Sequence, residues 1–176
     1  EDGYYCWLER SEVLGRAFNR GPWEPNLLDR LAIEDRLPAV LNWVQNASEK
    51  KNKYLWGGTI GPDFDCSGLV QSAFASRDIW LPRDAYQQEQ FCQKLQNISD
   101  NFDLLKAGDL LFFGTAYRCT HVAIYSGKGK YFHSSGIING HNGIACDQLD
   151  VSEKNSVGFH YRSQLLSAGR VVRCHD

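Results

Sequence analysis

The residue types needed for nucleophilic catalysis by a thiol occur at Cys66, His121 and His133. Asp65 is a good helix cap and a helix-like run follows Cys66, which predicts that the thiol lies in a first helical turn. The macrodipole and the unpaired N–H groups of a helix N-terminus favour a thiolate there. A histidine beside the sulfur can exchange its proton, and a third polar residue can orient that histidine. The three residues therefore predict a Cys–His–His triad with a thiolate–imidazolium pair.

Each of these residues also has a purely structural interpretation. Cysteine is often buried as a small apolar residue, His121 precedes the core-like run Val122-Ala123-Ile124, and His133 lies beside a predicted turn. The position of Cys66 before a helix, with histidines in later strand-like runs, favours the catalytic interpretation. We predict that the other histidines are surface or structural residues: His141, His160 and His175.

The elements that must position the triad separate into helices followed by strands. Pro38 suits the first turn of a helix, and the predicted helices cover residues 38–51, 66–77 and 84–92. Aromatic and β-branched residues predict strands over 109–114, 121–126, 131–134, 143–148 and 170–173. We expect a polar connection at 93–108 and irregular structure at 149–159. This order predicts an α+β fold, with His121 and His133 facing the same way on adjacent strands.

Six motifs follow one another in the chain: YLWGG, DCSGLVQ, LPRDAYQQ, AGDLLFF, HVAIYSGKGKYFH and GRVV. From about Leu37 to the C-terminus, the chain resembles the NlpC-type family of bacterial peptidoglycan cysteine peptidases. The resemblance implies a papain-like fold in which the cysteine helix packs against the sheet that carries the histidines. It implies no metal or organic cofactor.

The resemblance also implies a second group of site residues. The Tyr54 hydroxyl would help the Cys66 backbone N–H to stabilise an oxyanion. Asp65 would pair with a substrate amine, and Ser67 would donate to the peptide. The structural alternatives stay open: Tyr54 as a core residue, Asp65 as only a helix cap, and Ser67 as a solvent-facing hydroxyl.

Residues 1–36 differ from the predicted peptidase domain at 37–176. Residues 3–8 read as a short aromatic strand and residues 20–25 as a loop or edge segment. The Gly-Tyr-x-x-Trp-Leu pattern looks like the closing strands of a bacterial Src-homology-3-type barrel, but a complete barrel needs about 60 residues. Two interpretations therefore remain: a partial accessory barrel, or an arm packed on the catalytic domain.

Composition limits the classes of partner. The net charge is −2 with scattered basic residues, so we expect neither nucleic-acid binding nor a polybasic membrane patch. No apolar run approaches the ~20 residues that span a bilayer. The six widely spaced cysteines predict mostly free thiols and no zinc site. The chain contains no methionine, which we interpret as a processed form or a fragment, so a cell-envelope or a cytoplasmic location stays open.

These observations predict a cysteine endopeptidase that cleaves the peptide stem of peptidoglycan. The expected bond joins γ-D-glutamate to a diamino acid, either diaminopimelate or lysine, as the resemblance implies. One alternative is a papain-like amidase or acyltransferase with a different acceptor. Another is a non-catalytic wall-binding module, which would predict a broken triad.

Overall fold

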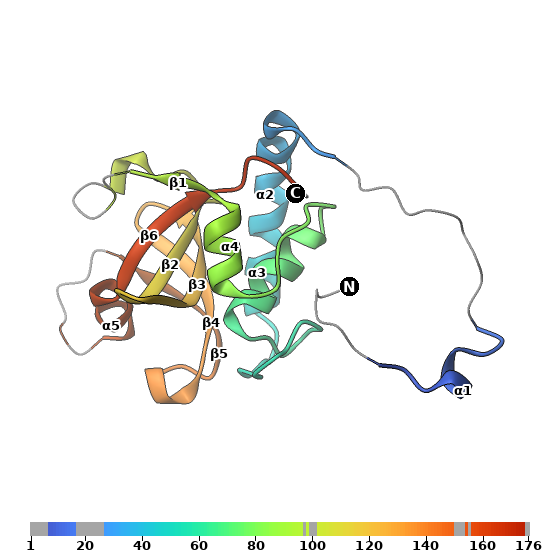
Figure 1. Cartoon of the computed structure of the whole chain (residues 1–176). Helices are drawn as coiled ribbons and strands as arrows, with labels where there is room; N and C mark the ends of the chain where they lie inside the picture. Colours follow the sequence, from blue (N-terminus) through green and yellow to red (C-terminus); the bar gives the residue numbers. More distant parts are fainter. Residues whose placement is uncertain are drawn as a thin grey trace.

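The computed structural model describes residues 7–16, 27–96, 98, 102–149, 154 and 156–174. Figure 1 shows the arrangement of its helices and strands. The helices are α1 (Arg10–Val13), α2 (Arg30–Ser48), α3 (Cys66–Ala75), α4 (Ala85–Phe91) and α5 (Val157–Ser163), with 3₁₀ turns η1 (Phe102–Leu104) and η2 (Ile137–Asn139). The strands are β1 (Gln93–Leu95), β2 (Leu110–Thr115), β3 (Arg118–Gly127), β4 (Lys130–Ser135), β5 (Gly143–Gln148) and β6 (Leu165–Arg170).

The strands form one antiparallel sheet in the order β1-β6-β2-β3-β4-β5. The prediction of helices packed on an antiparallel sheet is therefore confirmed. The last strand was predicted too late, because Ala168 pairs with Leu111 and β6 ends at Arg170. The connection predicted at 93–108 contains the short edge strand β1, whose Leu95 also pairs with Ala168.

Alternate residues of the central strands face two different cores, as the two-residue period of a strand requires. One core contains residues of α2, α3 and α4 together with Leu110, Phe112, Val122 and Ile124. The other contains Tyr161 of α5 together with Leu111, Phe113, Ala123 and Tyr125. Figure 1 shows α2, α3 and α4 gathered on one side of the sheet, with α5 apart from them.

Helix α2 begins eight residues before the predicted start at Pro38, which lies inside it. Asp29 caps the helix by accepting a hydrogen bond from the Ala32 N–H at 2.8 Å. The proline costs one backbone hydrogen bond. The helix continues through it because Ile33, Val40 and Val44 lie on one fully buried stripe. The predicted domain boundary between residues 36 and 37 falls within this helix.

Helix α5 replaces part of the irregular segment predicted at 149–159. Ser156 caps it by accepting a hydrogen bond from the Phe159 N–H at 3.2 Å. Buried Tyr161 fixes the helix to the sheet, a tertiary contact that local sequence does not reveal. The predicted aromatic segment at 3–8 lies largely outside the described residues, and the loop at 20–25 lies entirely outside them.

The described cysteines are all free thiols, as predicted: Cys66, Cys92, Cys119, Cys146 and Cys174. Cys6 lies outside the described part of the chain. Within the described ranges, no helix combines the length and the apolar character needed to cross a membrane.

Candidate active site

Cys66 is the first residue of α3, as the sequence predicts. The Asp65 carboxylate caps the helix, because its Oδ1 accepts a hydrogen bond from the Gly68 N–H at 2.6 Å. The Cys66 side chain is buried, and its sulfur accepts a hydrogen bond from the Val122 backbone N–H in β3. The sulfur therefore lies against this strand at the residue that follows His121.

The loop before α3 passes so close to the helix that it requires glycines. A Cβ on Gly68 would lie 2.0 Å from the carbonyl oxygen of Gly58. That same carbonyl accepts a hydrogen bond from the Asp65 N–H at 3.2 Å, and Asp65 Oδ2 accepts one from the Gly57 N–H at 2.9 Å. A side chain at Gly68 would therefore push the loop away from the first turn that holds Cys66.

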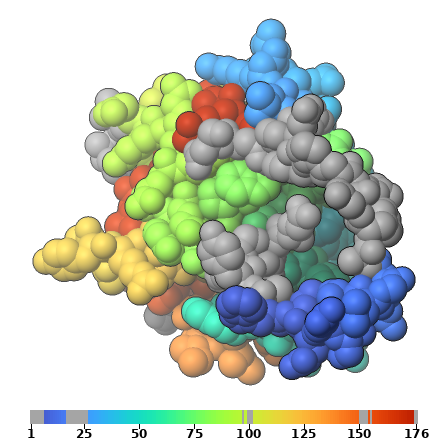
Figure 2. Space-filling model, turned by 45° about the vertical axis from the view of Figure 1, so that its right-hand side comes forward, coloured from blue at the N-terminus to red at the C-terminus, as the bar shows by residue number. Residues whose placement is uncertain are grey.

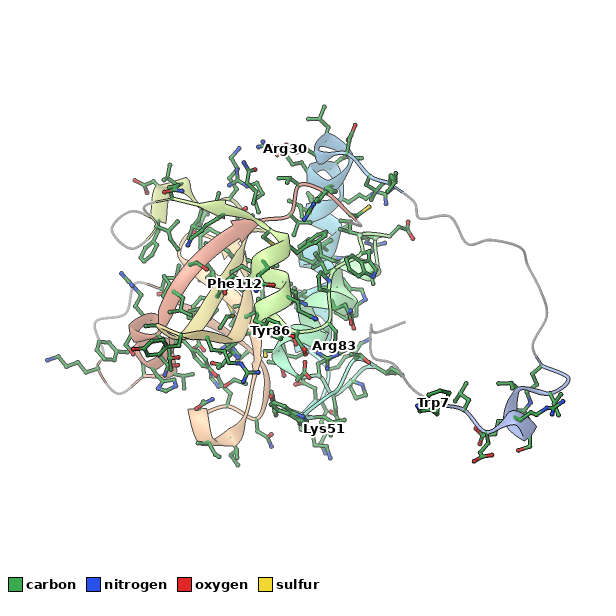
Figure 3. All side chains as sticks on the ribbon, in the orientation of Figure 1. Trp7, Arg30, Lys51, Arg83, Tyr86 and Phe112 are labelled. Atoms are coloured by element: carbon green, nitrogen blue, oxygen red, sulfur yellow. The ribbon has the colours of Figure 1, made fainter. Side chains whose placement is uncertain are left out.

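Arg83 also holds the first turn of α3 in position. Its two terminal nitrogens donate to Asp65 Oδ1 at 3.1 Å and Oδ2 at 2.5 Å, and one also donates to the Ser67 hydroxyl at 2.8 Å. Figure 3 labels Arg83 close to Tyr86 at the start of α4. Asp65 and Ser67 thus have intramolecular partners in the first turn of α3. Their predicted contacts with a substrate remain predictions.

The two histidines of the predicted triad lie in contact. His121 Nε2 and His133 Nδ1 are 2.8 Å apart, and the rings meet edge to face with centroids 5.0 Å apart. His133 is fully buried and His121 is 9% exposed. The prediction that these residues occupy adjacent strands and face the same way is confirmed. Since His133 occupies Nε2 of His121, Nδ1 is the ring nitrogen that the predicted proton transfer from Cys66 would use.

The far side of His133 holds two residues that sequence reasoning did not assign to the site. His133 Nε2 lies 2.8 Å from Asp147 Oδ2, and His141 Nε2 lies 2.8 Å from the same oxygen. The β4–β5 register explains the contact, because His133 pairs with Ala145 and Tyr131 with Asp147, which puts both on one face. Asp147 was inside a predicted strand, but no local signal gives the register.

Tyr161 is a third residue that the sequence analysis did not identify. Its ring stacks on His121 with centroids 4.4 Å apart and meets His133 edge to face at 4.7 Å. Its hydroxyl is hydrogen-bonded with Ser135 at 2.7 Å and accepts from the Asn139 side chain at 3.1 Å. Tyr161 therefore packs both imidazoles in place from α5.

Tyr54 lies at the edge of the same site. Its backbone N–H donates to Asn142 Oδ1 at 3.3 Å, and its ring lies next to Gly136. Burial, with added repulsion from a Cys66 thiolate, raises its pKa well above the usual range. The Tyr54 hydroxyl is therefore protonated and available as a donor, as the predicted oxyanion role requires.

Burial dominates the pKa values of the predicted nucleophile, Cys66, and of its predicted base, His121. It raises the pKa of the Cys66 thiol to about 11, and the Asp65 charge reinforces it against the hydrogen bond from the Val122 N–H. Burial, with the neighbouring His133, lowers the pKa of His121 well below its usual value. The directions of these two pKa shifts oppose the expected thiolate–imidazolium pair. Desolvation has a larger effect on the pKa of Cys66 than the helix N-terminus has. Without substrate, the site therefore favours a neutral thiol with a neutral imidazole.

One side-chain cluster in the described ranges could hold a metal ion: His133, His141 and Asp147, whose ligand atoms lie within 4.8 Å of one another. Both imidazoles sit at hydrogen-bonding distance from one carboxylate oxygen. Cluster residue His133 also bonds His121, so a metal held there would compete with the triad for His133.

Exposed apolar side chains lie on the two segments that flank the site. Trp56 and Ile60 belong to the loop before α3, and Ile137 and Ile138 belong to η2. Figure 2 shows this loop and the η2 region next to each other at the lower edge of the molecule. The ring of Tyr54 against Gly136 joins the two segments at their base. The two segments therefore present exposed apolar side chains on either side of the Tyr54–Gly136 contact.

Residues 51–161 match the NlpC/P60 family. The chain is 38% identical over 123 residues to the bifunctional muramidase/DL-endopeptidase CwlT of Bacillus subtilis, covering 67% of this chain and 32% of that protein. It is 43% identical over 86 residues to the gamma-D-glutamyl-L-lysine dipeptidyl-peptidase of the same organism, covering 46% of this chain and 27% of that protein. The chain thus spans about a third or less of these two relatives.

Two further comparisons extend the similarity. The murein DD-endopeptidase MepS/murein LD-carboxypeptidase of Escherichia coli is 34% identical over 98 residues, which cover 53% of this chain and 50% of that protein. Among solved structures, an NlpC/P60 family protein from Bacillus cereus superposes with a TM-score of 0.62 at 25% identity, covering 77% of this chain and 40% of that chain.

Proposed function

Because the chain belongs to the NlpC/P60 family, we propose that it is a cysteine peptidase that cleaves the peptide stem of bacterial peptidoglycan. The proposed bond joins γ-D-glutamate to the diamino acid that follows it. One observation carries the proposal: Cys66 begins α3 with its sulfur at the Val122 N–H of β3, and the preceding residue of that strand, His121, is hydrogen-bonded to His133. The segment that matches the family, residues 51–161, contains the proposed nucleophile, base and orienting residue in that order.

The first half-reaction forms a thioester on Cys66. His121 Nδ1 takes the thiol proton as the sulfur attacks the scissile carbonyl, so the imidazole becomes a cation and the carbonyl oxygen an anion. The tetrahedral intermediate then collapses, and His121 returns its proton to the leaving amine of the diamino acid. The general-base step fits the neutral thiol and neutral imidazole that burial favours.

The second half-reaction returns the enzyme. Water attacks the thioester carbonyl while His121 Nδ1 takes a proton from it, and the Cys66 sulfur leaves and recovers a proton from His121. The new carboxylate is that of γ-D-glutamate. A donor at each oxyanion would lower both barriers, and we assign this work to the Cys66 backbone N–H and the Tyr54 hydroxyl.

The assignment of the bond is supported by the relative whose name states gamma-D-glutamyl-L-lysine specificity. Another relative is named as a DD-endopeptidase and LD-carboxypeptidase. Cleavage of a different bond in the stem is therefore an alternative for this chain. An amidase or acyltransferase would use the same thioester but a different acceptor. Product analysis separates these cases, because each leaves a different pair of fragments.

The test is a panel of synthetic stem peptides incubated with the purified protein and resolved by liquid chromatography with mass detection. One set carries L-lysine and the other diaminopimelate after γ-D-glutamate, each with a free or an acetylated L-alanine amine. We expect cleavage after γ-D-glutamate in at least one set. Cleavage only at a D-alanine bond, or transfer without hydrolysis, would overturn the assignment. The acetylated peptides also test the proposed amine contact of Asp65.

A further inference from the structure

We propose that Asp147 and His141 are positioning residues that, through His133, fix which ring nitrogen of His121 can accept the Cys66 proton. The inference rests on the proposed triad and extends it by two residues. The four side chains come from β3, β4, β5 and the loop before β5. They form a hydrogen-bonded line that runs from the buried base to the molecular surface.

The distances in this line are short and similar. His121 Nε2 to His133 Nδ1, His133 Nε2 to Asp147 Oδ2, and Asp147 Oδ2 to His141 Nε2 each measure 2.8 Å. Beyond His121, the exposed fraction of the side chains rises from 0% for His133 to 16% for Asp147 and 28% for His141. The line thus begins in the packed site and ends at solvent.

The charge of Asp147 determines the direction of every hydrogen bond. Burial alone would raise its pKa, but the hydrogen bonds from His133 and His141 outweigh this and lower it. An ionised carboxylate only accepts hydrogen bonds, so both imidazoles must present a protonated Nε2 to it. His141 is therefore a second donor that holds the accepting oxygen in place.

The ionised Asp147 carboxylate sets the tautomers of His133 and His121. Burial keeps His133 neutral at pH 7, because it lowers its pKa against the opposing effect of Asp147. A neutral His133 with its proton on Nε2 has only a lone pair on Nδ1. The bond to His121 therefore requires His121 to donate from Nε2, which leaves the lone pair of His121 on Nδ1, the nitrogen that must take the thiol proton.

Without the carboxylate, the opposite arrangement becomes equally possible. A neutral amide at position 147 can donate to His133 Nε2 as well as accept from it. His133 would then donate from Nδ1, and His121 would carry its proton on the nitrogen intended for the sulfur. Such molecules have no base, although every side chain keeps its place. This result distinguishes tautomer control from simple packing.

The first test measures the tautomers directly in the wild-type protein. Imidazole ¹⁵N correlation spectra at pH 7.5, with EDTA present to remove bound metal, should show His133 protonated at Nε2 and unprotonated at Nδ1. His121 should likewise carry its proton on Nε2. A wild-type His133 protonated at Nδ1 would overturn the proposal. This measurement needs no substrate, so it stands or fails separately from the proposed peptidase activity.

The second test is kinetic. Asp147→Asn should lower kcat by about ten- to hundredfold while KM stays within about twofold, since orientation and not binding is lost. His141→Gln should have a smaller effect in the same direction. Asp78→Asn is the matched control, because the Asp78 side chain is exposed in a surface ion pair with Arg36, and it should leave kcat unchanged.

A double-mutant cycle separates positioning from general stability. In a His133→Asn background, Asp147→Asn should cause no further loss of kcat, because an asparagine side chain has no ring tautomer for Asp147 to set. An equal loss in both backgrounds, or an Asp147→Asn enzyme with wild-type kcat, would overturn the proposal. If Asp147→Asn does not fold, the wild-type ¹⁵N spectrum decides.

Discussion

The acidity of single residues in the site follows from burial more than from local sequence. A helix N-terminus favours a thiolate, but Cys66 is also buried against β3 and beside the Asp65 carboxylate, and its pKa rises to about 11. The pKa of His121, the proposed base, shifts in the opposite direction. Both shifts stabilise uncharged forms, so in the proposed mechanism the proton moves during the reaction and not in the resting protein.

The two pKa shifts predict how kcat/KM and the alkylation of Cys66 depend on pH. Because the pKa of His121 lies below about 6.5, the base is already free at pH 6.5, and kcat/KM should fall only below that value. Iodoacetamide alkylation of Cys66 should keep rising above pH 8.5, as the thiol ionises later than an ordinary one. An alkylation rate that reaches a plateau below pH 7 would instead indicate a thiolate–imidazolium pair in the free enzyme.

His133 should act through orientation. His133→Ala should lower kcat by about a hundredfold with little change in KM, because His121 loses the partner of its Nε2. His133→Asn should recover at least about tenfold of this loss, since an amide oxygen can accept the same hydrogen bond. Steady-state kinetics at pH 7.5 provide both values. An Asn variant as inactive as the Ala variant would mean that His133 does more than orient the ring.

The residues that sequence reasoning could identify are those with a local context. Cys66 stands in a capped helix start, and His121 and His133 stand in strands joined by a recognisable turn. Asp147 and Tyr161 reach the same site only through the β4–β5 register and the docking of α5. No local sequence pattern indicates that either residue belongs to the site. Only the three-dimensional structure shows their contacts with the histidines.

At the scale of elements, α3 is held in position by a buried ion pair. The Arg83–Asp65 pair is 2% and 10% exposed, and the carboxylate also caps the helix. Arg83→Met should lower the free energy of unfolding by about 3–5 kcal/mol, because it leaves a buried carboxylate without its cation. Urea denaturation measures this loss.

Arg30→Met provides the matched control for Arg83→Met. The Arg30–Glu34 pair is exposed and lies within one helix, so its removal should cost less than about 1 kcal/mol. Figure 3 labels both arginines. Similar losses in the two variants would mean that the Asp65–Arg83 pair does not anchor α3.

Element boundaries were predictable where caps are local and not where tertiary packing decides. Asp65 marks the start of α3 correctly. The predicted start of α2 at Pro38 was wrong, because a stripe of buried residues from Ile33 to Val44 stabilises the helix on both sides of the proline. The position of β6 depends on its pairing with β2, which no single segment specifies.

At the scale of the whole molecule, the buried histidines should make the fold sensitive to acid. Burial lowers the pKa of His121 and of His133, so the unfolded chain binds protons on both more readily than the folded protein. Their contribution to stability is complete above about pH 6.5 and is lost as the pH falls through the folded pKa values. The lowered pKa of Asp147 acts in the same direction at lower pH.

We therefore expect the free energy of unfolding to decrease between pH 7.5 and pH 5. Urea denaturation at several pH values measures it, and His133→Asn should flatten the decrease because one buried imidazole is gone. A free energy of unfolding that is constant or larger at pH 5 would show that these histidines are not held neutral by the fold.

The proposed function requires the fold to bring the Cys66 sulfur to a carbonyl of the peptidoglycan peptide stem. The most direct measurement is mass spectrometry of muropeptides digested by the wild-type protein and by Cys66→Ala. The wild type should release fragments ending in γ-D-glutamate, and Cys66→Ala, with an unchanged melting temperature, should release none. The same fragments from Cys66→Ala, or no stem cleavage by the folded wild type, would contradict the proposed function.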